Sequence, residues 1–193
     1  MYGLFFQKLN EIIILSNEEQ EIIAAYLTSK KLRKKQYLLQ AGDVCKAIAF
    51  VEKGALREYS VDENGHEHIL QFALEGWLIS DLYSFMMTES ATYNIDALED
   101  CELVLITKTA QDEILKRVPQ FETYTRMQIT GAYLAMQKRV TAMISLTPEQ
   151  RYLYFISLYP NIAQRVPQHM IASYLGLSPE TLSRIRKRIG AAR

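Results

Sequence analysis

Three side chains near the end of the chain, Glu180, Ser183 and Arg184, are suited to reading the edges of DNA bases. An arginine can donate two hydrogen bonds to O6 and N7 of guanine, and a glutamate can accept one from N4 of cytosine. Glu180 and Arg184 are four residues apart, so on a helix they would share one face and reach neighbouring base pairs. The same spacing also permits a simple ion pair on a helical hairpin, so the residues around this base-reading group must decide.

The surrounding residues predict two helices joined by a tight turn. Pro167 suits the first turn of a helix, and Gly176 can adopt the left-handed conformation that ends it. Ser178 as N-cap and Pro179 at the first helical position then begin a second helix. Its apolar residues recur at helical spacing and would pack inward: Leu182, Ile185 and Ile189. This pattern is typical of a helix-turn-helix, whose second helix enters the major groove of DNA.

Polar and basic residues flank the base-reading group and suit contacts with DNA phosphates: Ser178, Thr181, Arg186, Lys187, Arg188 and Arg193. Charge is also unevenly distributed along a chain that is neutral overall. Residues 165–193 hold six basic residues and one acidic residue, a net charge of +5, which leaves −5 for the other 164 residues. A basic end on an acidic body is expected where that end meets a polyanion.

The composition indicates a soluble protein with enough residues for two small domains. No apolar run approaches the length of a membrane span, and the first residues show neither a basic leader nor a small-residue cleavage site. We therefore expect a cytoplasmic protein with no membrane partner. Cys45 and Cys101 lie far apart and are expected to be small buried apolar residues rather than a disulfide or a metal site.

From residue 37 to residue 106 the pattern changes to short apolar stretches separated by turn residues. Asn64-Gly65 is a strong signal for a hairpin turn. Many short strands with regular turns predict a small barrel or roll, here of jelly-roll type. The predicted strands cover residues 37–40, 47–51, 55–61, 68–74, 94–97 and 101–106.

Helical signals precede these strands. An amphipathic helix is expected at the N-terminus, and the capping box of Ser16 and Glu19 begins a second helix that runs to about Thr28. The basic run from Lys30 to Lys35 is predicted to be a solvated connector, although its composition would also suit a nucleic-acid patch.

Three further helices are predicted after the strands. Thr109 caps a short helix through Val118, a long helix covers about 119–146, and Thr147 caps another through about Leu158. Apolar residues of the long helix recur at spacings of 4, 3, 4 and 3, as in a coiled-coil seam: Ile129, Tyr133, Met136, Val140 and Met143. The alternative is a stripe packed against the chain's own roll. A dimer is favoured because helix-turn-helix proteins commonly pair to read two half-sites.

The order of these elements resembles that of the CRP/FNR family of bacterial transcription regulators, and the resemblance covers nearly the whole chain. The most specific matches are Ala-Gly-Asp at 41–43, the segment 51–59 and, above all, the segment 178–184. The last is similar to the Glu-x-x-Ser-Arg recognition helix of the FNR-like branch, whose members read a TTGA-like half-site in an inverted repeat. The resemblance therefore implies a homodimer on double-stranded DNA, with base edges contacted by the base-reading group and RNA polymerase as a further partner.

The fold class expected on this basis is α+β. It comprises a β-roll sensor domain at 1–118, a long dimerisation helix at 119–146 and a helix-turn-helix domain at 147–193. In such an arrangement a signal in the roll would shift the pair of long helices and so set the spacing of the two recognition helices.

The roll departs from the family at the cyclic-nucleotide pocket. Members that bind cyclic AMP hold its ribose and phosphate with a Gly-Glu pair and an Arg-Ser pair, because a buried anion needs a guanidinium and N–H donors. The corresponding places here hold Ser80-Asp81 and Ala91-Thr92, and residues 76–97 contain no arginine. Cyclic AMP is therefore not expected, and the concavity would suit a less anionic ligand or be filled by side chains. The candidate pocket residues are Ser80, Asp81, Ala91, Thr92, Met136 and Gln137.

Two other cofactors are also not expected. An iron–sulfur cluster normally needs about four cysteine thiolates, and the chain has two cysteines. His66 and His68 lie beside a hairpin turn, where exposed residues rather than haem ligands are expected. The sequence ends soon after the recognition helix, so phosphate contacts that relatives make with a β-hairpin wing are expected to fall to Arg188 and Arg193.

Two other function classes compete with a transcription regulator. One is a ligand-binding or protein-interaction module with a vestigial helix-turn-helix, which salt-dependent binding to a palindromic duplex would distinguish. The other is an enzyme, which the sequence disfavours. It shows no nucleophile and base at a recognisable spacing, no glycine-rich phosphate loop and no metal-ligand cluster.

Overall fold

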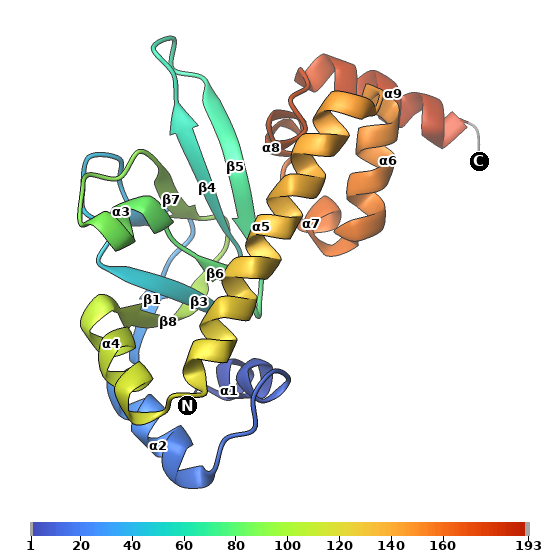
Figure 1. Ribbon diagram of the computed structural model, residues 1–193. Coiled ribbons are helices and arrows are strands. Elements are labelled where there is room, and N and C mark those ends of the chain that lie inside the picture. Colours follow the sequence, from blue (N-terminus) through green and yellow to red (C-terminus); the bar gives the residue numbers. More distant parts are fainter. Residues whose placement is uncertain (1, 192–193) are drawn as a thin grey trace.

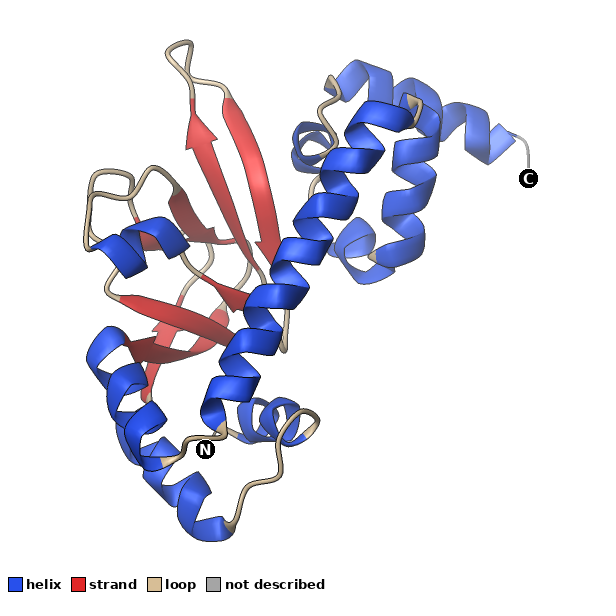
Figure 2. Ribbon diagram, in the orientation of Figure 1, coloured by secondary structure: helices blue, strands red, loops and turns tan. Residues whose placement is uncertain are grey.

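The computed structural model describes residues 2–191 and shows three regions in sequence order. A β-roll with helices at one end is followed by one long helix, α5, which leads to a group of helices at the other end of the molecule (Figure 1). Figure 2 shows that the strands all belong to the roll, and the elements that follow β8 in the chain are all helices. The observed class is α+β, as predicted.

The helices differ in length, from one or two turns to the 25 residues of α5. They are α1 (Gly3–Asn10), α2 (Asn17–Tyr26), α3 (Leu82–Met87), α4 (Lys108–Arg117), α5 (Phe121–Ser145), α6 (Pro148–Leu158), α7 (Pro160–Arg165), α8 (Gln168–Tyr174) and α9 (Pro179–Ala191). The strands are β1 (Thr28–Leu32), β2 (Tyr37–Leu39), β3 (Ala47–Lys53), β4 (Leu56–Val61), β5 (Glu67–Ala73), β6 (Leu78–Ile79), β7 (Asn94–Ala97) and β8 (Cys101–Thr107).

The strands form two antiparallel sheets of four strands each. One has the order β1-β8-β3-β6 and the other the order β2-β7-β4-β5. Apolar side chains from both sheets meet in the roll interior, among them Leu103 of β8, Leu56 of β4 and Ile95 of β7. Strand β8 shows the alternation that this requires, because Leu103 faces the interior while Val104 joins a different cluster outside the sheet.

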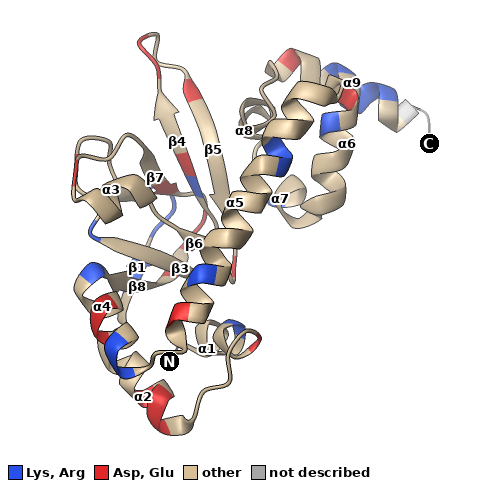
Figure 3. Cartoon of the chain, in the orientation of Figure 1, with Lys and Arg blue, Asp and Glu red and all other residues tan. Residues whose placement is uncertain are grey.

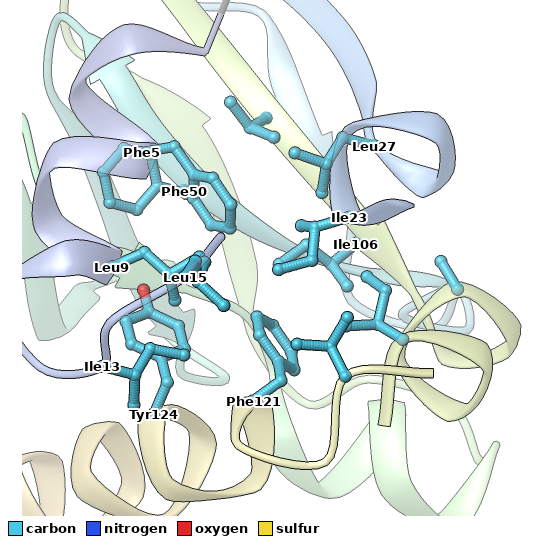
Figure 4. Packing of buried hydrophobic residues seen from close by; sticks show 14 residues of the cluster. Phe5, Leu9, Ile13, Leu15, Ile23, Leu27, Phe50, Ile106, Phe121 and Tyr124 are labelled. Atoms are coloured by element: carbon cyan, nitrogen blue, oxygen red, sulfur yellow. The ribbon is translucent and has the colours of Figure 1, made fainter. Parts of the chain in front are cut away.

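The outer face of the first sheet is covered by the N-terminal helices, α4 and the start of α5. Phe5 packs edge-on against Phe50 of β3, with ring centroids 5.2 Å apart, and Phe121 and Tyr124 of α5 close the cluster (Figure 4). Ile23 of α2 is fully buried in the same cluster. The first turn of α5 is therefore anchored to the roll. This contact fixes the direction in which α5 extends away from the roll.

Several elements begin or end where the sequence predicts. The capping box of Ser16 and Glu19 is present, and Thr147 forms a second capping box with Gln150. The hairpin between β4 and β5 turns at Gly65, whose φ is 81°. Cys45 and Cys101 are both buried as free thiols.

Other elements correct the prediction. The basic run is not only a connector, because Lys30 and Lys31 lie in β1, which pairs with β8. Strand β1 is polar because it is an edge strand, and charged side chains protect such an edge from further pairing. Thr107 rather than Thr109 caps α4, since its Oγ1 accepts a hydrogen bond from the N–H of Ala110 at 3.1 Å. The short elements α3, α7 and β6 were not predicted, since each is too brief to show a period.

Gly54, between β3 and β4, lies where two backbone segments approach closely. Its φ is 96°, and a Cβ at this position would come within 2.6 Å of the carbonyl oxygen of Asp100 and 2.7 Å of Cys101 Sγ. Gly42 has a similar φ of 94°, but a Cβ there would meet nothing within 4 Å. The two glycines thus share a conformation and differ in the space around them.

We predict that Gly54→Ala destabilises the fold by about 2–5 kcal/mol and Gly42→Ala by about 1–2 kcal/mol, because only the first adds a backbone clash to the cost of positive φ. Urea unfolding followed by circular dichroism measures both. Equal losses in the two variants would show that the close approach at Gly54 carries no cost.

Candidate nucleic-acid interface

Helices α8 and α9 form the predicted helix-turn-helix. The turn between them passes through Gly176, whose φ is 66°, and the N–H of Leu177 donates to the carbonyl oxygen of Ala172 at 2.9 Å. Ser178 begins α9, because its Oγ accepts a hydrogen bond from the N–H of Thr181 at 3.2 Å. Leu182 and Ile185 are buried in the core of the C-terminal helices, which orients the opposite face of α9 outward.

The base-reading group lies on that outward face, with all three side chains exposed. Arg184 Nε donates to the backbone carbonyl oxygen of Glu180 at 3.4 Å, and the two side chains form no ion pair among the described residues. Hydrogen bonds from its own backbone N–H and from Ser178 lower the pKa of Glu180, which keeps the carboxylate ionised as an acceptor. The interpretation of Glu180 and Arg184 as a mere surface ion pair therefore has no support in the geometry.

The predicted phosphate-contact residues are distributed along the same helix. Ser178, Arg186 and Lys187 are exposed, and Figure 3 shows basic residues following α9 at the end of the molecule away from the N-terminal helices. Thr181 is partly buried and its Oγ1 accepts a hydrogen bond from Ser178 Oγ at 3.1 Å. Arg193 lies outside the described residues.

Two arginines of the basic end have carboxylate partners within the chain. Arg188 Nη2 is hydrogen-bonded to Glu149 at the start of α6. Arg165 lies between two roll carboxylates, 2.7 Å from Glu75 Oε2 and 2.6 Å from Glu99 Oε2, and its hydrogen bonds are the main cause that lowers the pKa of Glu75 to about 2. Arg165 therefore contributes to a contact with the roll rather than to the DNA-facing charge that its position in the sequence suggested.

The C-terminal helices pack against the outer face of the second sheet. One continuous apolar cluster includes Phe72 of β5 together with Phe155 and Ile171 of the C-terminal helices. The rings of Phe72 and Tyr174 have centroids 5.6 Å apart. Ser173 of α8 also binds the edge of β5, because its Oγ accepts from the N–H of Ile69 at 3.0 Å and donates to the carbonyl oxygen of Glu67 at 2.9 Å. The helix-turn-helix is thus seated on the roll.

Arg139 connects α5 to β5 and to the end of α8. The sequence did not predict this role. Its guanidinium donates to the carbonyl oxygens of Ile69 and Leu70 in β5, and to that of Tyr174 at 2.8 Å. It also lies 3.9 Å from the centre of the Tyr174 ring. No local signal marks Arg139 as a joining residue, because its partners are between 35 and 70 residues away in sequence.

The predicted seam of α5 is exposed in the single chain. Its side chains retain between 44% and 63% of their accessible surface: Ile129, Tyr133, Met136, Val140 and Met143. They are therefore not packed against the chain's own roll, which was the alternative interpretation.

The roll residues proposed as a pocket are held together by one carboxylate. Asp81 is 3% exposed; its Oδ1 accepts from the N–H of Ser84 at 2.9 Å and its Oδ2 from the N–H of Thr92 at 3.0 Å. Ala91 is buried beside this contact, and Ser80 precedes it. Met136 and Gln137 are exposed on α5, and Figure 1 shows the middle of α5 well apart from α3, so the single chain does not bring all six candidates together.

Comparison with known proteins shows what this architecture is similar to. The cyclic nucleotide-binding domain family matches residues 29–118. The fumarate and nitrate reduction regulatory protein of Yersinia pestis is 27% identical over 168 residues, covering 81% of this chain and 66% of the relative. The transcriptional activator protein Anr of Pseudomonas protegens is 26% identical over 167 residues, with 81% and 68% covered. The chain spans about two thirds of the length of these curated relatives.

The curated relatives and the solved structures that the chain is similar to are regulators of the CRP/FNR family.

Solved structures show the family's fold. FixK2 from Bradyrhizobium japonicum superposes with a TM-score of 0.73 at 18% identity, covering 86% of this chain and 85% of FixK2. The c-di-GMP-responsive regulator CLP of Xanthomonas campestris gives a TM-score of 0.69 at 17% identity, covering 92% and 93%. Among the described residues, no helix is both long and apolar enough to cross a membrane.

Within the roll, the sequence did not predict a second buried carboxylate, Glu58. Glu58 is 2% exposed and shares the interior face of β4 with Leu56. Burial, followed by the charge of Asp81, raises the pKa of Glu58 to about 8. The only signal in the sequence was an acidic residue within a predicted strand.

This burial predicts a pH dependence of stability. The folded chain keeps the proton on Glu58 up to about pH 8, whereas the unfolded chain releases it near 4.5, so stability falls as the pH rises through that window. We predict that Glu58→Gln removes this loss and is more stable than the wild-type chain at pH 8 by on the order of a few kcal/mol.

Urea unfolding at pH 5 and pH 8 measures the effect, with the exposed Glu63→Gln as the matched control. A Glu58→Gln variant that follows the wild-type pH dependence would contradict the assignment.

Proposed function

We propose that this chain is a homodimeric, sequence-specific DNA-binding transcription regulator of the CRP/FNR type. The observation that carries the proposal is the outward face of α9, where Glu180, Ser183 and Arg184 are exposed without an ion pair between them. Exposed Arg186 and Lys187 extend the same helix with charges suited to phosphates. Two of the relatives are a regulatory protein and a transcriptional activator, which agrees with this role.

The dimer is proposed from α5. An exposed apolar stripe of about two heptads on a long helix is unfavourable in water, and a second copy of α5 would cover it. A symmetric pair would present two α9 helices to two half-sites of an inverted repeat. We include RNA polymerase as a further partner on the resemblance to the FNR-like branch alone.

We propose further that the roll does not bind cyclic AMP in the way of cyclic-AMP-responsive members. The N–H groups of Ser84 and Thr92, which would suit a phosphate, are already bonded to Asp81. A bound phosphate would also face the negative charge of Asp81, with no arginine between residues 76 and 97 to offset it.

The base-reading role predicts a loss of discrimination. Arg184→Ala should lower the preference for an inverted repeat of TTGA-like half-sites over a scrambled duplex by about tenfold or more relative to the wild-type chain, because each bidentate arginine contact contributes about 1–3 kcal/mol of discrimination. Arg186→Ala, changed on the same exposed helix, should weaken binding to both duplexes alike and reduce the salt dependence. Fluorescence anisotropy over about 50–200 mM salt measures both quantities. Equal affinity of the wild-type chain for every duplex would refute sequence-specific binding.

Two matched variants test whether the apolar stripe of α5 forms the dimer contact. Met136→Glu places a charge at the centre of the proposed dimer contact and should give a monomer, with a large loss of affinity for the inverted repeat. Met87→Glu is the control, because Met87 of α3 is exposed to almost the same degree, 58% against 59% for Met136. Native mass spectrometry reports the mass of each. A Met136→Glu variant that remains a dimer would place the contact elsewhere.

A further inference from the structure

A cavity lies where the long helix meets the C-terminal helices. It has a volume of about 340 Å³, which is within the range of small-molecule sites. We call it the hinge cavity, because α5, α6 and α8 all contribute to its wall. Apolar side chains dominate the lining, including Leu134 of α5, Phe155 of α6 and Tyr174 of α8.

The polar part of the lining carries one sign of charge. Lys138, Arg139 and Arg151 line the hinge cavity, and no aspartate or glutamate in the described part of the chain does. Arg139 donates only to backbone carbonyl oxygens, and Arg151 Nη1 donates to the carbonyl oxygen of Leu175 at 2.8 Å. Neither guanidinium forms an ion pair with any residue in the described part of the chain.

Both guanidiniums also have an unused donor inside the protein. The Nε atoms of Arg139 and Arg151 are buried and have no hydrogen-bond partner among the described residues. A buried donor without a partner costs free energy, and a buried cation without a counter-charge costs more. Burial accordingly lowers the pKa of Arg139, as expected for a guanidinium that lacks a carboxylate neighbour. The side chains of the cavity are therefore suited to bind an anion.

The long helix of a second copy would not supply such an anion. In a symmetric parallel pair, the partner's α5 would present the same residues at the same height. Glu122 is the single acidic residue of α5, and it is 17 residues from Arg139, or about 25 Å along a helix. Charge complementarity thus favours a small anion, rather than the α5 helix of a partner, as the occupant of the hinge cavity.

We propose that the hinge cavity binds an amphipathic carboxylate, with an apolar body among Leu134, Phe155 and Leu158 and its carboxylate on Arg139 and Arg151. A guanidinium recognises a carboxylate through paired charge-assisted hydrogen bonds, and the apolar wall takes the rest of the molecule out of water. This site is separate from the roll concavity and from α9. It touches both the long helix and the helices that carry α9, so its occupant would bear on how the two are oriented.

Binding can be measured with octanoate as the probe and octan-1-ol as its uncharged match. Trp77 is the only tryptophan of the chain, and its ring lies 5.7 Å from that of Tyr159, which lines the cavity, so its fluorescence reports occupancy. We expect saturable binding of octanoate to the full chain, about tenfold or more tighter than that of octan-1-ol. The titration contains no DNA, so its outcome is independent of the proposed regulator function.

Two variants test whether Arg151 binds the carboxylate of octanoate. Arg151→Met should reduce octanoate affinity about tenfold while leaving octan-1-ol binding unchanged. Arg126→Met is the control, because Arg126 lies on α5 with 62% of its side chain exposed, and it should bind octanoate as the wild-type chain does. Circular dichroism confirms that each variant is folded, and the comparison of the two probes on the wild-type chain does not depend on either variant.

Two results would overturn the proposal. One is the absence of saturable octanoate binding, and the other is equal affinity of the wild-type chain for octanoate and octan-1-ol.

Discussion

The guanidinium of Arg139 connects the three regions of the molecule. It extends from the middle of α5, donates to the backbone of β5 and to the end of α8, and stacks on Tyr174. Because the first turn of α5 is anchored beneath the roll by Phe121, the contact at Arg139 holds the helix at a second point. The direction of α9 follows from these two attachments. A side chain that serves neither as a base reader nor as a seam residue therefore contributes, with the apolar cluster around Phe72, to where the readers lie.

The surface between the roll and the C-terminal helices is mixed in character. An apolar cluster centred on Phe72 and Phe155 excludes water, while Arg165 binds Glu75 and Glu99 at its rim. Interfaces with a polar rim of this kind are common between domains that move relative to one another. The ion pairs also redistribute charge, because they offset Arg165 and leave the exposed positive charge concentrated along α9. The exposed basic surface therefore covers fewer residues than the basic segment 165–193 of the sequence.

Prediction succeeded where the signal was local. Capping residues at Ser16 and Thr147 mark real helix starts, and the uninterrupted period after residue 119 gives a helix within two residues of its observed bounds. Secondary-structure prediction failed where an element forms only through pairing with another part of the chain or is very short. Strand β1 is polar and becomes a strand only through pairing with β8, and α3 has six residues and is started by Asp81. A short element carries too few residues to show a period, so its sequence alone does not distinguish it from a loop.

The helix-turn-helix, its outward polar face and the apolar stripe of α5 could all be predicted from the sequence, because each depends on residue types at fixed helical spacing. Tertiary structure alone decided which charges remain unpaired. Arg165 and Arg188 have carboxylate partners 90 and 39 residues away, whereas Arg139 and Arg151 meet at one cavity with only carbonyl partners. Helical period reports the face on which a side chain lies, but it carries no information about the group that the fold brings against that face. The base-reading helix could thus be read from the chain, and the anion site beside its hinge could not.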